Sequence, residues 1–435
     1  MRRTICFLPM FCLLSVAMPG EAADWPHWRG PARNDVSSEQ SGWNGQFWVT
    51  GPLWEINVGE GSSSAVVVGD RVYLTGWSQN LDTIFCLNGE TGKELWRQSC
   101  QSPRYGRFAM GDQKLYSGAC STPEYDSDTE LLFTLGVDGD LNAWDTRRDG
   151  QLSWSLNVYD RYDVERRPEV AERKKTQRDY GYMSSPLVIG RQLIVEVGAR
   201  AGNLVSFDKR TGSELWRSEN RDEAGHTGGP VPIRVQGVPC VAVLTLRNLV
   251  VTRVEGAEAG RTVVVYPWTT DYGNNIATAA VSGNSIIITS AYNHFAMCRL
   301  KITLNGATKV WENELASGVC SPVIHEGHVY WAWRGVHCVD FETGSEIWSG
   351  GKVGSQGSCI LTGDDRLIVY ANKGSLSLLE TAKRSPQKYT QLAAETVFSK
   401  TDAWPHVVLA EGRLICRDRD GNVRCLVVGS GPVAN

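Results

Sequence analysis

One short turn-and-strand segment occurs several times in this sequence, and it restricts the fold more than any other feature. The clear copies are Asn88–Trp96, Asp208–Trp216 and Asp340–Trp348, each with Thr-Gly in the middle and Trp at the end. Degenerate copies are Asp145–Trp154 and Asn305–Trp311. An Asp or Asn side chain caps a turn, the Gly adopts positive φ, and the following residues form a strand. Repetition of this hairpin predicts a repeat protein in which each Trp packs against the neighbouring unit.

Eight units follow one another, and a small residue precedes nearly every first strand. These strands start near Ser64, Thr122, Ser185, Gly229, Ala279, Ser321, Cys359 and His406. Small residues are expected where strands converge on a central axis, and about 50 residues per unit is the length of a propeller blade. The sequence therefore predicts an all-β fold, an eight-bladed β-propeller of four-stranded antiparallel blades.

The two ends of the chain complement each other. Leu53–Val58 resembles the end of a blade without its beginning, whereas Trp404–Val428 has the beginning without the Thr-Gly and Trp ending. Pairing of these segments would close the ring and remove two exposed sheet edges. We predict a signal peptide at 1–23, an N-terminal arm at 24–52 and the propeller at 53–435. A charged insertion at 159–181 is interpreted either as a lid or as a solvated surface segment.

The first residues have the pattern of a cleaved signal peptide: Arg2 and Arg3, the apolar run Ile5–Val16, and small residues up to Ala23. We therefore expect a periplasmic or secreted protein. No later segment is apolar and long enough to span a bilayer. The net charge is −4 and no basic stripe occurs, which argues against nucleic-acid binding. We expect a monomer.

Ten of the twelve cysteines follow the predicted signal peptide. Four of them occupy a position that Ala143 or Ser206 fills in other repeats, which predicts small buried thiols: Cys86, Cys298, Cys338 and Cys425. Cys100 and Cys120 lie outside that position and close together in sequence. In an oxidising compartment they are the predicted disulfide. His325 and His328 flank a predicted turn and are interpreted as surface residues, not metal ligands.

The repeats resemble the PQQ-like (quinoprotein-type) β-propeller family. Ser-Pro strand starts, Gly-Asp turns and the Asp-x-x-Thr-Gly-x-x-x-Trp endings carry the resemblance, which covers residues 53–428. The chain is most similar to exported propellers of the BamB-like kind, and the opening Trp25–Pro31 is also found in that family. The resemblance implies a fold and leaves the function open.

Three function classes compete on this fold. The first is an exported, non-catalytic scaffold or binding module, with another protein or a cell-envelope component as partner. The second is a PQQ-dependent alcohol or sugar dehydrogenase, for which the resemblance implies quinone and calcium. We disfavour that cofactor because the chain has no Cys-Cys pair and no recognisable carboxylate-amide calcium set. The third is a hydrolase or lyase, but Gly-x-Ser-x-Gly and His-Glu-x-x-His are absent, so no catalytic residue is predicted.

A binding site is expected at one mouth of the central channel. His406 replaces the small residue that other blades have before the first strand, and Trp404 stands two residues earlier. Further large or polar residues fall near the same end of other blades, so that the candidate site comprises Tyr182, His226, Asn275, Gln356, Trp404 and His406. The alternative is that the aromatic side chains fill the channel and the histidines bond to backbone carbonyls.

Overall fold

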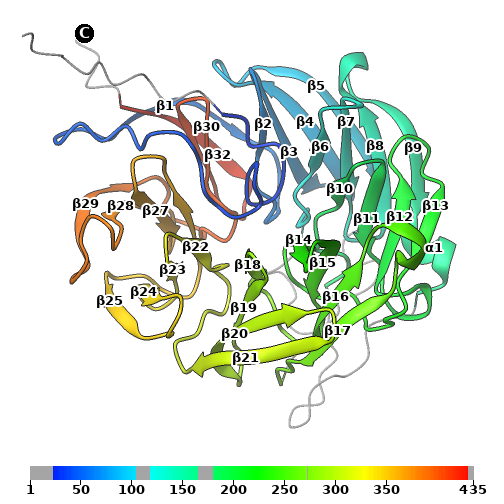
Figure 1. Ribbon diagram of the computed structural model, residues 1–435. Coiled ribbons are helices and arrows are strands. Elements are labelled where there is room, and N and C mark those ends of the chain that lie inside the picture. Colours follow the sequence, from blue (N-terminus) through cyan, green and yellow to red (C-terminus); the bar gives the residue numbers. More distant parts are fainter. Residues whose placement is uncertain (1–22, 104–117, 165–179, 272, 430–435) are drawn as a thin grey trace, which may run out of the picture.

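The computed structural model describes residues 23–103, 118–164, 180–271 and 273–429. Within these ranges the chain forms eight four-stranded sheets arranged in a ring (Figure 1). Seven sheets use consecutive strands, and in the eighth the first strand of the chain joins the last three. The predicted all-β, eight-bladed propeller is confirmed. Residues 1–22 of the predicted signal peptide lie outside the described residues, as do residues 165–179 of the predicted charged insertion.

The first four blades contain the following strands. Blade 1 has β2 (Val66–Val68), β3 (Arg71–Ser78), β4 (Leu81–Asn88) and β5 (Glu94–Gln101). Blade 2 has β6 (Glu124–Asp126), β7 (Leu131–Leu135), β8 (Asp140–Asp145) and β9 (Gln151–Asn157). Blade 3 has β10 (Leu187–Ile189), β11 (Gln192–Glu196), β12 (Leu204–Asp208) and β13 (Glu214–Arg217). Blade 4 has β14 (Val231–Val235), β15 (Val238–Leu244), β16 (Asn248–Arg253) and β17 (Thr262–Pro267).

The remaining blades complete the ring. Blade 5 has β18 (Ala280–Ser282), β19 (Ser285–Ala291), β20 (Phe295–Thr303) and β21 (Gly306–Asn313). Blade 6 has β22 (Val323–His325), β23 (His328–Ala332), β24 (Val336–Asp340) and β25 (Glu346–Gly350). Blade 7 has β26 (Gly357–Leu361), β27 (Arg366–Ala371), β28 (Ser375–Glu380) and β29 (Gln391–Thr396). Blade 8 has β30 (Val408–Ala410), β31 (Arg413–Arg417), β32 (Asn422–Val428) and β1 (Val49–Asn57).

Helical structure in the described part of the chain is short. One α-helix, α1 (Val158–Tyr162), follows blade 2, and 3-10 turns cover Thr146–Arg148, Ala199–Ala201 and Gly256–Glu258. The Asn157 side chain caps α1 by accepting from the N–H groups of Tyr159 and Asp160. None of these described helices is long and apolar enough to cross a membrane.

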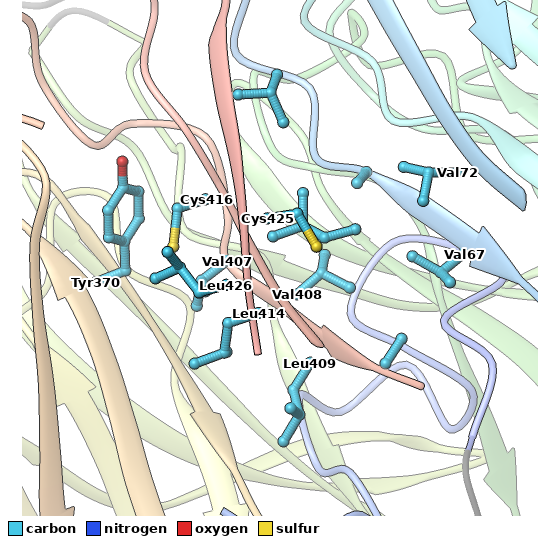
Figure 2. Close-up of a cluster of buried hydrophobic side chains, with 14 of the residues drawn as sticks. Val67, Val72, Tyr370, Val407, Val408, Leu409, Leu414, Cys416, Cys425 and Leu426 are labelled. Atoms are coloured by element: carbon cyan, nitrogen blue, oxygen red, sulfur yellow. The ribbon is translucent and has the colours of Figure 1, made fainter. Parts of the chain in front are cut away.

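The ring is closed by β1, which pairs antiparallel with β32. Trp54 lies opposite Cys425, and Ile56 lies opposite Val423. The strand begins at Val49, earlier than the predicted start at Leu53. Figure 2 shows the core behind this closure, where side chains of blades 7, 8 and 1 form one buried cluster. The predicted pairing of the N-terminal strand with the last blade is confirmed, because both ends of the chain contribute to one sheet and one core.

Trp54, Trp154 and Trp311 each pack on the Thr-Gly turn of the next blade. A Cβ atom placed on Gly92 would lie 2.7 Å from the Trp54 ring, and one on Gly212 would lie 2.8 Å from the Trp154 ring. Trp54 Nε1 also donates to the carbonyl of Gly89 at 2.8 Å. The glycine therefore does two things: it adopts positive φ in its own turn, and it leaves room for the indole of the preceding blade.

Hydrogen bonds to side-chain hydroxyls join neighbouring blades around the channel. Residues two positions before an innermost strand donate their N–H to the next blade: Ser64 to Thr122 Oγ1, Thr122 to Ser185 Oγ, and Thr278 to Ser321 Oγ, each at 3.0 Å. Between blades 8 and 7 the direction is reversed, and the Val407 N–H donates to Ser358 Oγ at 3.1 Å. We call the side chains of Thr122, Ser185, Thr278, Ser321 and Ser358 the hydroxyl ring. The small residues predicted at these positions therefore have two roles. They fit where the innermost strands converge, and their hydroxyl oxygens accept hydrogen bonds from backbone N–H groups.

Candidate functional site

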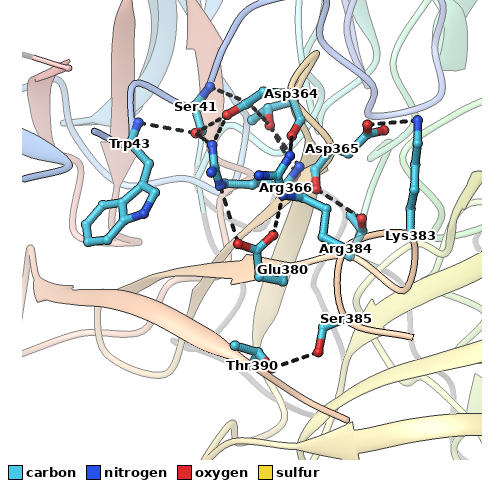
Figure 3. Close-up of polar contacts among 12 residues, drawn as sticks. Ser41, Trp43, Asp364, Asp365, Arg366, Glu380, Lys383, Arg384, Ser385 and Thr390 are labelled. Carbon is cyan, nitrogen blue, oxygen red and sulfur yellow. Dashed lines mark hydrogen bonds and ion pairs between the residues drawn. The ribbon is translucent and has the colours of Figure 1, made fainter. Parts of the chain in front are cut away.

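The N-terminal arm, residues 24–48, runs across one end of the central channel and is fixed to several blades. Trp25 forms a bridge with Val67 of blade 1, and Val36 forms one with Leu361 of blade 7. Figure 3 shows a further anchor, where Asp364 accepts from the backbone N–H of Ser41 at 2.7 Å and from its hydroxyl at 2.8 Å. Between these anchors, Trp28 Nε1 donates to Thr278 Oγ1 at the start of blade 5 and Arg33 pairs with Glu124 of blade 2, so the arm spans the channel.

Arg29 is buried between the arm and two innermost strands. Its guanidinium donates to the carbonyls of Ala279 at 3.1 Å and Pro322 at 2.6 Å, and it also pairs with Asp35. Asp35 in turn lies 3.2 Å from His406 Nε2, while His406 Nδ1 lies 2.6 Å from the Val407 carbonyl. Burial raises the pKa of Asp35, but the Arg29 charge and His406 outweigh it, so the pKa is lowered overall. This cluster holds the arm in the channel.

A cavity of about 120 Å³ opens on the channel side of Trp28, which closes it toward the arm. The volume is enough for several water molecules or for a small organic group. Its walls combine aromatic, apolar and uncharged polar residues, and the described lining residues include no Asp, Glu, Lys or Arg side chain. The main lining residues are Trp28, Ser62, Cys120, Tyr180, Met183, His226, Thr227, Asn274, Ile276, Tyr292, Val319, Trp404 and His406, together with members of the hydroxyl ring.

Some polar atoms in this wall have no hydrogen-bond partner among the described residues. Asn274 Oδ1 and Thr227 Oγ1 are among them, and their residues are 5% and 1% exposed. A buried polar atom without a partner costs free energy unless water or a ligand satisfies it. Trp28 contributes no further donor, because its Nε1 already lies 3.3 Å from Thr278 Oγ1. The cavity therefore offers an acceptor and a hydroxyl to an incoming uncharged polar group.

The structure brings three of the six predicted site residues to this cavity: His226, Trp404 and His406. The other three do not line it. Tyr182 is buried and donates its hydroxyl to the Val197 carbonyl at 2.9 Å. Asn275 is buried and its Nδ2 donates to the carbonyls of Thr245 and Trp268. Gln356 is half-buried, beside the lining residue Gly357.

The sequence did not predict several cavity residues that lie next to the three predicted residues outside the cavity. Tyr180 and Met183 line the cavity close to Tyr182, and Asn274 and Ile276 flank Asn275. Trp28 was also missed, although it belongs to the Trp-rich opening of the arm. The Trp-rich opening could have indicated that the arm contributes to the cavity, since an exposed arm would not need so many Trp side chains.

The predicted Cys100–Cys120 disulfide is not formed, and both residues are free thiols. Cys120 lines the central cavity, and its Sγ donates to the Gly118 carbonyl at 3.3 Å. Cys100 lines a separate small pocket together with Ala119 and Ser121. Successive residues of an extended segment point to opposite sides, so Cys120 faces away from the pocket that holds Cys100. The four predicted core thiols, Cys86, Cys298, Cys338 and Cys425, are buried and free.

One cluster outside the channel has the composition of a metal site. The ligand atoms of His325, Glu326 and Asp365 lie within 4.8 Å of one another. Lys383 Nζ lies 3.0 Å from Glu326 Oε2 and 2.9 Å from Asp365 Oδ2, so an ammonium group already balances these carboxylates. His325 and His328 are both half-buried.

Comparison with known proteins decides the family. A family model described as outer membrane protein assembly factor BamB matches residues 49–294, 126–350 and 302–434. These matches together cover the propeller and most of the chain. The chain belongs to the BamB family. The predicted resemblance to PQQ-like, BamB-like propellers is thereby confirmed. No curated protein matches the sequence significantly.

Solved structures similar to this BamB-family chain share its fold at low sequence identity. BamB from Moraxella catarrhalis is 12% identical with a TM-score of 0.58, covering 87% of this chain and 99% of that one. Quinohemoprotein alcohol dehydrogenase from Comamonas testosteroni is 12% identical with a TM-score of 0.62, covering 95% and 81%. The computationally designed Ika8 protein is 12% identical with a TM-score of 0.53, covering 85% and 99%. Such similarity shows the propeller fold alone.

Proposed function

We propose that this chain is an exported, non-catalytic binding propeller whose channel mouth receives an uncharged segment of a partner protein in the cell envelope. The observation that carries the proposal is the cavity above Trp28, closed by the arm and lined without charged side chains. Aromatic walls with a few polar atoms are the usual composition of a binding pocket. The unpartnered Asn274 Oδ1 supports it further, because it can accept from a peptide N–H or an amide side chain.

A protein partner is favoured by family membership, since the matching model is described as an assembly factor for outer membrane proteins. A signal peptide at 1–23, predicted from the sequence, supports export. Tryptophan and tyrosine side chains bury large area at low entropic cost, which suits recognition of an apolar segment by Trp404 and Tyr180. The Arg419 guanidinium lies 5.3 Å from the Trp404 ring centre and limits the motion of that side chain.

A quinone dehydrogenase is the second candidate, favoured by the similarity to the Comamonas enzyme. The residues present do not fit its cofactor. Calcium prefers carboxylate and carbonyl oxygens, and the carboxylates of the quinone need cationic partners, whereas the described cavity wall has neither acidic nor basic side chains. Dye-linked oxidation of alcohols or aldose sugars by the protein after addition of quinone and calcium would contradict this assignment.

The proposed function is tested by placing a photoreactive amino acid at Trp404 and, as a control, at Leu215 on the outer strand β13. Leu215 is 37% exposed and faces away from the channel. We expect crosslinks to an envelope protein from position 404 and none from position 215.

Trp404→Ala should reduce capture of the same protein at least tenfold and change Tm by only a few degrees. Equal crosslinking from both positions, or unchanged capture by Trp404→Ala, would show that the mouth does not bind the partner. His406→Ala is unsuitable here, because it would leave Asp35 without its His406 partner.

A further inference from the structure

Two cysteines from neighbouring blades are in contact inside the channel wall. Cys320 precedes β22 of blade 6, and Cys359 lies in β26 of blade 7. Their Sγ atoms are 3.7 Å apart, and the residues are 2% and 1% exposed. No other pair of described cysteines has such a contact among the hydrogen bonds of the structure, and Cys100 and Cys120 face different pockets.

We propose that Cys320 and Cys359 form an inter-blade disulfide when the chain folds in an oxidising compartment. The sulfur atoms, now 3.7 Å apart, must approach to about 2.05 Å, and they are kept close because β26 of blade 7 packs against β22 and β23 of blade 6. The innermost strands of blades 6 and 7 hold this juxtaposition, and Ala332 N–H donates to Cys320 Sγ at 3.3 Å. The bond would replace the bridge that the sequence predicted elsewhere.

The reaction is a thiol–disulfide exchange with an oxidised dithiol protein or oxidised glutathione. The thiolate of one cysteine attacks the external disulfide and releases one thiol, which leaves a mixed disulfide. The second cysteine, as thiolate, then attacks the protein sulfur of that mixed disulfide and releases the second thiol. Both protons of the two cysteine thiols end on the two released thiols, and two electrons pass from Cys320 and Cys359 to the oxidant.

The burial of Cys320 and Cys359 determines the stage of folding at which the disulfide can form. Burial, with the neighbouring Cys320 adding to it, raises the pKa of the Cys359 thiol well above its usual value, so the folded protein holds very little of the reactive thiolate. Exclusion from solvent also keeps an oxidant away. The bond therefore closes before blades 6 and 7 pack, and afterwards it resists reduction.

The bond would fix one wall of the central cavity. Val319 and Ser321 flank Cys320, and Ser358 precedes Cys359, and all three line the cavity. A crosslink between blades 6 and 7 prevents these blades from separating at the channel. It also closes a loop between cysteines 39 positions apart, which restricts the unfolded chain.

The test uses the full chain refolded in a glutathione redox buffer, with free thiols alkylated in denaturant and the peptides mapped by mass spectrometry. We expect one peptide pair joined through Cys320 and Cys359, with two hydrogens lost. Oxidised protein should melt about 4 °C above the same protein after reduction in denaturant and refolding with reductant.

Two alanine variants separate the bond from general effects of a lost thiol. Cys359→Ala should abolish the difference in Tm between oxidised and reduced protein, whereas Cys338→Ala, at a buried thiol of the same blade pair, should keep it. Full alkylation of both cysteines after oxidative refolding, or a crosslink that joins other cysteines, would overturn the proposal. So would a difference in Tm that persists in Cys359→Ala.

Discussion

Asp82 lies at the start of β4, next to other acidic side chains. The pKa of its carboxyl is raised to about 7, chiefly by burial; a hydrogen bond from Ser102 lowers the pKa, and the charges of Asp138 and Asp140 raise it. Its Oδ1 has no hydrogen-bond partner among the described residues. A carboxyl in such surroundings favours the neutral form in the folded protein.

The pH dependence of stability at Asp82 follows from this direction. The folded pKa is above the ordinary value of 3.8, so the contribution is fully present below pH 3.8 and is lost as pH rises through about 7. Asp82→Asn does not titrate, and it should therefore raise Tm over wild type by an amount that grows between pH 4 and pH 8, to roughly 3 °C. Thermal melts at several pH values measure this. Asp70→Asn, at an exposed carboxyl, is the control. A constant difference in Tm across this range would contradict the prediction.

Single residues are also where prediction of the site from sequence was least accurate. The blade starts were correctly placed, but a strand alternates its side chains between two sides with a period of two. An error of one position therefore moves a side chain from the channel into the blade. Asn275 was predicted where Asn274 and Ile276 face the cavity, and Tyr182 was predicted beside Met183. His226, Trp404 and His406 do line the cavity.

At the scale of elements, the Thr-Gly turn and the preceding blade's Trp form one packing unit. The sequence predicted both the turn and the inter-blade packing of the indole, since all copies are local and share one spacing. It could not show that the Trp rests on the Gly of the next turn, because that contact joins residues far apart in sequence. Gly212 shows the consequence: it has φ 68° and would place a Cβ atom 2.8 Å from the Trp154 ring.

Gly212→Ala should therefore destabilise the protein more than an alanine at an unpacked turn. Gly190 is the matched control, with φ 58° and no atom within 4 Å of the position that a Cβ atom would take. Gly190→Ala carries only the strain of a left-handed backbone, about 1–2 kcal/mol. Gly212→Ala adds overpacking against Trp154, about 1–3 kcal/mol more. Denaturant unfolding compares the two variants. Equal losses in the free energy of unfolding would show that the indole contact contributes nothing.

At the scale of the whole molecule, the arm and β1 close the protein in different ways. The arm closes one end of the channel through Trp28 and Arg29, and β1 completes the sheet of blade 8. The sequence predicted the closing strand, because Leu53–Val58 has the pattern of the end of a blade without the beginning of that blade. It did not predict the course of the arm, since an extended segment without periodicity gives no sign of its distant partners such as Leu361 or Gly412.

Two truncations separate these roles. A chain beginning at residue 49 lacks the arm and should melt roughly 5 °C or more below the chain beginning at residue 24, because Trp25 and the Arg29–Asp35 pair are lost. A chain beginning at residue 61 also lacks β1, which leaves β32 as an unpaired edge. It should aggregate and show no cooperative melting. Calorimetry and size-exclusion chromatography measure both. A chain from residue 61 as stable as that from residue 24 would refute closure by β1.

Because β1 and β32 belong to the same sheet, blade 8 can be completed only late in the synthesis of the propeller. β1 is made before the other described strands of the propeller, but its partner β32, which ends at Val428, is made after them. Blades 1 to 7 are contiguous in sequence and can form while synthesis continues. The earliest strand must wait, unpaired, until all the other blades and β32 have been made or have been delivered across a membrane. A helper that shields Val49–Asn57 during this interval would speed maturation without touching any finished blade.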